Sequence, residues 1–235
     1  MHIVTAASQN HLKTLVQFIN SFLKFYIDSK HVTLIVYDLG IETIYWEDLK
    51  NSTKLIKNII YKVFDYSKYP SYLNVNINAG EYAWKPVIIY DTCVEFNDIV
   101  IWFDSGNLFL KPLDMLHGHL LQNHLYSAIS GGNILRWTHP KTIEFMNCDM
   151  KMLNNPNRNA ACVAFNYNTK WVKEFVKEWK DLALTKQCIA PEGSSRLNHR
   201  QDQAVLTILY YKYQEKYNFV DIPYYLDFTI HNDCD

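Results

Sequence analysis

The sequence predicts an α/β domain in which a mostly parallel sheet is flanked by helices. Its first 40 residues read as strand, helix and strand, the pattern of a unit with two parallel strands. Residues 32–37 form a near-continuous β-branched and apolar run, typical of a strand covered on both faces. Hydrophobic residues make up 49% of the 235 residues, so the chain can bury a sizeable core. The sequence shows no repeat, low-complexity tract or linker, and we expect one domain over residues 1–235.

The opening strand and helix follow from the spacing of apolar side chains. Residues 3–7 are a short apolar run, and Ser8 behind them is suited to cap a helix. Apolar side chains then recur every three or four residues, which places them on one face of a helix. They are Leu12, Leu15, Val16, Ile19, Phe22, Leu23 and Tyr26.

The remaining elements are predicted in the same way. Alternating polar and apolar side chains predict a strand at 72–78. An apolar run predicts a buried strand at 99–103, and a short strand is expected at 126–129. Helices are expected at 47–64, 82–92, 171–183 and 201–217.

Charge and cysteine content exclude several classes of protein. The 23 basic and 24 acidic residues leave a net charge of −1, so we expect no nucleic-acid partner. The five cysteines are scattered without a C-x-x-C pair, which predicts free thiols in a reducing compartment. The N-terminus does not read as a signal peptide, and the sequence holds no apolar run long enough to span a membrane. A cytoplasmic protein is therefore expected.

Polar residues follow three of the predicted strands. They stand at residues 6–8, at 37–38 and at 104–107. In open α/β sheets ligands bind beyond the carboxyl ends of the strands, so these turns are the expected binding edge.

Asp104 lies between the apolar strand 99–103 and an apolar stretch at 108–113. This arrangement resembles the D-x-D segment of GT-A fold glycosyltransferases. Other segments are similar, in the same order, to motifs of glycosyltransferase family 8, and the resemblance covers most of the chain. They are residues 3–11 and 37–41 at two nucleotide-binding strand ends, 82–85 in the helix before D-x-D, 159–163, 199–203, and His231 at the place of a late metal-ligand histidine.

The resemblance implies a Rossmann-like GT-A domain that moves a sugar from a nucleotide-sugar donor, UDP-linked in that family, to a glycan, protein or small-molecule acceptor. It implies Asp202 and Gln203 at the reacting face of the sugar, with the anomeric configuration retained. Asp104 and His231 are the implied ligands of Mn²⁺ or Mg²⁺, which would stabilise the diphosphate leaving group. The expected donor-binding residues are Thr5, Ala6, Ser8, Asn10, Tyr37, Asp38, Lys85, Asp104, Ser105, Gly106 and Asn159.

The polar, basic loop at 194–200 is the expected acceptor site. Its candidates are Arg196, His199 and Arg200. The sequence also leaves room for a homodimer.

Several alternatives stay open. Gly106 stands where the second aspartate of D-x-D coordinates the metal, so Asn107, Asp233 or water would replace that ligand. Without a metal, Lys85 and Arg200 would form the cationic clamp on the phosphates. If the enzyme inverts, Asp202 would be the general base for the acceptor. Asp104 and Asp202 also suit a turn and a helix cap, and a catalytically inactive domain that binds sugars or a partner is the alternative function.

Overall fold

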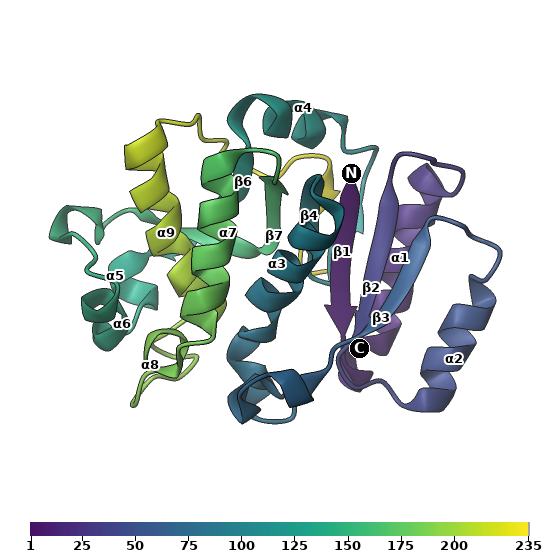
Figure 1. Ribbon diagram of the computed structural model, residues 1–235, viewed down its shortest axis with the longest axis horizontal. Coiled ribbons are helices and arrows are strands. Elements are labelled where there is room, and N and C mark those ends of the chain that lie inside the picture. The colour runs from purple at the N-terminus through teal and green to yellow at the C-terminus, as the bar shows by residue number, and fades with distance from the viewer. Residues whose placement is uncertain (235) are drawn as a thin grey trace.

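The computed structural model describes residues 1–234, and its centre is a six-stranded sheet in the order β3-β2-β1-β4-β7-β6. β1 (His2–Ala7) pairs in parallel with β2 (Thr33–Asp38) and with β4 (Ile99–Phe103). β3 (Ile59–Val63) extends this parallel part beside β2. β7 (Pro156–Asn166) runs antiparallel between β4 and β6 (Leu125–Asn133). The sheet is therefore mixed and mostly parallel, as predicted (Figure 1).

Helices cover both faces of the sheet. The buried side chains of α1 (Leu12–Tyr26), α2 (Thr43–Ser52) and α4 (Asp114–Asn123) belong to the core on one face. Those of α3 (Trp84–Phe96), α7 (Lys170–Ala183) and α9 (Gln201–Tyr217) belong to the core on the other. Short elements join them: β5 (Leu108–Phe109), α5 (Ile134–Trp137), α6 (Pro140–Phe145), α8 (Lys186–Ile189) and β8 (Phe228–Thr229).

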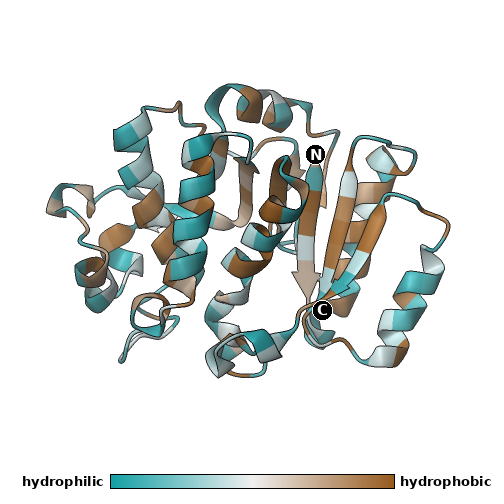
Figure 2. Cartoon of the chain, in the orientation of Figure 1, coloured by the Kyte–Doolittle hydropathy of each residue, from teal (hydrophilic) through white to brown (hydrophobic). Residues whose placement is uncertain are grey.

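The two cores share the strands between them. Along β4, Val100 and Trp102 face the α3 side while Ile101 and Phe103 face the α1 side. All four side chains are fully buried, which explains why this strand is apolar without interruption. Figure 2 shows the same arrangement, with apolar central strands and helices that are hydrophilic on their outer surfaces. A strand buried on both faces holds its end rigidly, and Asp104 lies at that end.

Two predicted elements are wrong. The helix expected at 47–64 ends at Ser52, and its second half is β3, where Ile59 and Ile60 pair with β2. The strand expected at 72–78 is a pair of turns, in which the Asn74 side chain accepts a hydrogen bond from the backbone N–H of Asn76. Such local bonds from asparagine compete with strand pairing. The sequence analysis also missed β7, which begins with four residues that do not read as a strand, 156–159.

Other expectations are confirmed. The helix at 201–217 has the predicted bounds, and all five cysteines are free thiols. Within residues 1–234, the structure contains no helix with the length and apolar character needed to cross a membrane.

Candidate functional site

A cleft of about 770 Å³ opens at the carboxyl ends of β1, β2 and β4. Its walls include the turns that follow these strands, at residues 6–11, at Leu39 and Gly40, and at residues 104–107. The small side chains of Ala6 and Ala7 leave the backbone of the first turn open to a ligand. This is the edge where open α/β sheets bind their ligands, so the cleft is the candidate site.

Many residues named from the sequence line this cleft. They are Ala6, Ser8, Asn10, Asp104, Ser105, Gly106, Arg196 and His231. Arg196 was expected at the acceptor, but its guanidinium lies 5.5 Å from the ring centre of Tyr82, another residue of this cleft.

Five expected donor residues do not line this cleft: Thr5, Tyr37, Asp38, Lys85 and Asn159. The Thr5 side chain is fully buried, and Tyr37 packs in the core on the α3 side. The Asp38 carboxylate accepts hydrogen bonds from the backbone N–H groups of Gly40 and Ile41 at 2.7 and 2.6 Å. Asp38 therefore shapes the turn after β2, and the turn itself supplies the surface that meets a ligand.

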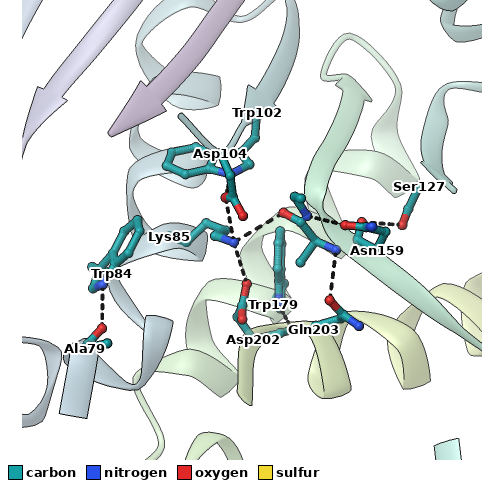
Figure 3. A network of polar contacts seen from close by, with 12 residues as sticks. Ala79, Trp84, Lys85, Trp102, Asp104, Ser127, Asn159, Trp179, Asp202 and Gln203 are labelled. Carbon is teal, nitrogen blue, oxygen red and sulfur yellow. Dashed lines mark hydrogen bonds and ion pairs between the residues drawn. The ribbon is translucent and has the colours of Figure 1, made fainter. Parts of the chain in front are cut away.

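Lys85 is the centre of a buried polar network beside the cleft (Figure 3). Its side chain comes from the first turn of α3 and is only 4% exposed. The ammonium nitrogen lies 2.9 Å from Asp104 Oδ1 and 3.1 Å from Asp202 Oδ2. It also donates to the backbone oxygen of Ala160 at 3.3 Å. One cation thus joins the end of β4, the start of α9 and the middle of β7.

Asp104 connects this network to the cleft. Its Oδ1 accepts a second hydrogen bond, from the indole N–H of Trp102 at 2.7 Å. Its side chain is 39% exposed and lines the cleft, and Oδ2 has no partner among residues 1–234. The network therefore fixes the orientation of Asp104 and leaves one carboxylate oxygen free for a ligand.

The buried carboxyl group of Asp202 has a raised pKa. Burial raises its pKa to about 6, an effect that the charge of Asp104 reinforces and the charge of Lys85 opposes. Burial alone would lower the pKa of Lys85, but the two carboxylates outweigh it and hold that pKa above its usual value. Lys85 is therefore charged at neutral pH, while Asp202 can take up a proton under mildly acidic conditions.

A second cleft, of about 470 Å³, adjoins the first because His231 lines both. It contains the expected residues Asn159, Arg200 and Gln203. Gln203 Oε1 accepts from the backbone N–H of Ala160, so Gln203 and Lys85 hold the same residue of β7. The expected residues that line a cleft are thus divided between two adjoining clefts.

His199 lies in neither cleft. Its side chain has no exposed surface, and its Nε2 lies 2.9 Å from the backbone oxygen of Ile189. Its Nδ1 accepts from the backbone N–H of His139 at 3.2 Å. Burial lowers its pKa to about 4, so the ring is neutral at pH 7. The structure therefore corrects the expectation that His199 meets an acceptor: it anchors the basic loop.

Solved structures of sugar-transferring enzymes have the same architecture. Galactosyltransferase LgtC, solved with donor and acceptor sugar analogs, matches with a TM-score of 0.58 and 19% identity, over 89% of this chain and 70% of LgtC. Mouse xyloside xylosyltransferase 1 matches with a TM-score of 0.57 and 11% identity, over 95% of this chain and 84% of that one. The glycosyltransferase GlyE of Streptococcus pneumoniae TIGR4 matches with a TM-score of 0.55 and 15% identity, over 94% of this chain and 44% of GlyE.

The chain has the GT-A fold. Residues 1–90 also match a family described as "Protein of unknown function (DUF1647)". No curated protein matches the chain. The GT-A fold agrees with the resemblance drawn from the sequence, at the level of architecture.

Gly106 and its neighbours decide whether this GT-A domain can bind a divalent cation. A Cβ atom on Gly106 would lie 2.2 Å from Asp233 Oδ1, so the glycine leaves the space that the Asp233 carboxylate occupies. Asp104, His231 and Asp233 all line the first cleft, and carboxylate and imidazole ligands suit Mn²⁺. Within residues 1–234 no three histidine, cysteine, aspartate or glutamate side chains form a group that could hold a metal ion. The three side chains therefore suit a divalent cation in their chemistry, but the structure does not bring them together as a group of ligands.

Sequence reasoning missed one wall of the same cleft. Val75, Asn76, Ala79, Tyr82 and Trp84 line it, in a segment that was partly predicted as a strand. The signal available was the unusual content of aromatic residues, 15% of the chain, because Tyr and Trp suit sites that need a flat apolar face.

Asp202→Asn should remove a pH dependence from the stability of the fold. The folded protein holds a proton on Asp202 up to about pH 6, whereas the unfolded chain releases it near 3.8. The free energy of unfolding of the wild type should therefore fall, relative to the variant, as the pH rises from about 4 to about 6, and the difference should be constant above that range. Urea unfolding across this range measures it. Asp48→Asn is the control for the same change of side chain at an exposed position of α2. A constant difference for Asp202→Asn would mean that Asp202 stays ionised.

Proposed function

We propose that this protein is a glycosyltransferase that moves a sugar from a UDP-linked donor to an acceptor hydroxyl. The observation that carries the proposal is the Lys85 network, which aims one free carboxylate oxygen of Asp104 into a cleft at the strand ends. The solved neighbours with this fold support it, since they are described as glycosyltransferases.

In this proposal the first cleft binds the nucleoside diphosphate and the adjoining cleft receives the donor sugar. The open backbone at Ala6 and Ala7 and the turn at Gly40 form the floor for the nucleoside, and the aromatic side chain of Tyr82 is part of the wall. The turn at 104–107 would meet the diphosphate. Gln203 lines the adjoining cleft, where it would contact the donor sugar.

Burial of Asp202 supports retention of the anomeric configuration. Asp202 is 4% exposed, lines neither cleft, and is paired with Lys85. A general base must reach the acceptor hydroxyl, directly or through one water. We therefore assign Asp202 a positioning role, in which it holds Lys85 and the start of α9 in place for Gln203.

Asp104, His231 and Asp233 would hold a divalent cation in the proposed enzyme. The cation would stabilise the negative charge that grows on the diphosphate as the glycosidic bond breaks. Gly106 serves this site by admitting the Asp233 carboxylate.

Calorimetric titration with UDP in the presence and absence of Mn²⁺ tests the proposal. We expect UDP to bind, Mn²⁺ to strengthen binding, and UDP at about 100 times its Kd to stabilise the fold by about 2.7 kcal/mol. Gly106→Ala should weaken the effect of Mn²⁺ by about ten-fold, or about 1.4 kcal/mol, because the added Cβ would displace the Asp233 carboxylate.

Gly118→Ala is the matched control, because a Cβ on Gly118 in α4 meets no atom within 4 Å. It should leave both titrations unchanged. ADP in place of UDP tests the choice of base. Absence of UDP binding, together with no release of UDP from UDP-glucose or UDP-galactose, would refute the proposed function. UDP binding that is equal in Gly106→Ala and wild type at every Mn²⁺ concentration would refute the metal site alone.

A further inference from the structure

The second cleft presents hydrogen-bond donors and no acid. It has a volume of about 470 Å³ and adjoins the first cleft, with which it shares His231. Two arginines, Arg136 and Arg200, line it, and among the described residues that line it there is no aspartate or glutamate. Neither arginine forms an ion pair within residues 1–234. The cleft therefore carries positive charge that no carboxylate of the described chain neutralises.

Trp137 holds the two guanidinium groups in place. The Arg200 guanidinium lies 4.2 Å from the centre of the Trp137 ring, and that of Arg136 lies 5.1 Å from it. A planar guanidinium stacked on an aromatic face keeps its N–H groups free at the edge, where they match the geometry of an oxyanion. The stacking therefore pre-orients both arginines without using their hydrogen bonds.

The indole is itself fixed by the turn at Gly132. Gly132 has φ +82°, a left-handed conformation that favours glycine. A Cβ there would lie 2.4 Å from the indole nitrogen of Trp137. Only a glycine at this position lets Trp137 pack against the backbone, so the platform for the arginines is built into the fold.

Asn157 adds a donor without a partner. It lines the same cleft and is 1% exposed. Its Oδ1 lies 2.9 Å from the Thr207 hydroxyl, which fixes the amide, while Nδ2 has no hydrogen-bond partner in the described chain. A buried amide donor without a partner costs free energy that an oxygen of a ligand would recover. This observation does not depend on the arginines, and it also indicates a ligand with a hydrogen-bond acceptor.

From these contacts we propose that the second cleft binds an oxyanion group of the acceptor substrate, namely a phosphate, sulfate or carboxylate on a sugar. Arg136 and Arg200 hold the anion, and Asn157 donates to one of its oxygens. The inference rests on the proposed function, because it treats the neighbouring cleft as the donor site and this one as the acceptor site. Under this proposal, the enzyme selects its acceptor substrate by the negative charge that the acceptor carries.

Calorimetry with four sugars tests the proposal: glucose 6-phosphate, glucose 6-sulfate, glucuronic acid and neutral methyl glucoside. At low ionic strength, at least one of the three anionic sugars should bind about ten-fold or more tightly than methyl glucoside. The three charged probes distinguish phosphate, sulfate and carboxylate. Arg136→Gln and Arg200→Gln should each reduce the affinity for the preferred anion by about ten-fold, because each removes one charge-assisted bond.

Lys170→Gln is the control for net charge, since Lys170 is exposed at the start of α7 and lines neither cleft. It should bind the anionic sugar as the wild type does. Arg136 is exposed, so its replacement leaves the core intact.

Equal affinity for charged and neutral sugars, no binding of any charged sugar, or undiminished binding by the Arg136→Gln, Arg200→Gln double variant would each overturn the proposal. The UDP titration is read separately. Anion binding without UDP binding would leave this cleft assigned and would count against the glycosyltransferase function alone.

Discussion

Replacing Lys85 with methionine should destabilise the fold by about 3–5 kcal/mol, the cost of removing one partner from a buried ion pair. Lys85 is 4% exposed and is the cation between Asp104 and Asp202. Its ammonium also lies 5.6 Å from the ring centre of Trp102, so a second favourable contact is lost with the charge. Urea denaturation measures the loss. It should be larger at pH 8 than at pH 5, because a protonated Asp202 no longer needs the cation.

Lys151→Met is a matched control for this loss. Lys151 also lies between two carboxylates, at 3.4 Å from Asp149 and 2.7 Å from Glu215, but its side chain is 60% exposed. Exposed pairs contribute about 0–1 kcal/mol, so this change should cost little. Adding Asp202→Asn to Lys85→Met should recover part of the stability, since it removes the buried charge that was left alone. If Lys85→Met lowered the free energy of unfolding no more than Lys151→Met does, the Lys85 network would not contribute to the stability of the fold.

The sheet and most of its helices could be predicted because their signals are local. Buried strands such as 99–103 are apolar without a break, and α7 shows a helical stripe. β3 could not be separated from the preceding helix, because a short run such as 59–63 fits either element until it finds a partner strand. β7 starts with polar residues, of which Asn157 and Arg158 are 1% exposed and form hydrogen bonds with Thr207 of α9. Its pairing therefore depends on contacts made far along the chain.

The site was partly predictable for the same reason. The pattern of polar residues directly after apolar strands predicted the position of the cleft, and Ser8 and Asp104 line it. The sequence could not show that Lys85 is shared by Asp104 and Asp202, because that network joins residues more than 100 positions apart. Nor could it show that Gly106 makes room for Asp233, because the two residues are also more than 100 positions apart. His199 looked accessible in a basic loop, and only the packing shows that it is buried.

Asp104→Asn should reduce sugar transfer by about 10²–10³-fold while the protein stays folded, a loss typical of removing one preorganised charged group from a transition state. Asparagine keeps the size of the side chain and an oxygen that can accept from Trp102, so the turn after β4 is preserved. It removes the carboxylate charge that faces the cleft, where the side chain is 39% exposed. The measurement is the turnover of the nucleotide sugar that the wild type uses, with folding checked by urea denaturation.

The distribution of the loss between kcat and KM reports what Asp104 does. A carboxylate that acts on the growing charge of the leaving group should lower kcat, with KM for the donor less affected. A carboxylate that only keeps Lys85 in place should instead be replaceable by asparagine with little loss, because Lys85 still has Asp202 at 3.1 Å. Asp48→Asn, an exposed change on α2, should leave turnover unchanged. Wild-type turnover in a folded Asp104→Asn variant would place the chemistry elsewhere, since it would show that the free oxygen of Asp104 meets no part of the reacting donor.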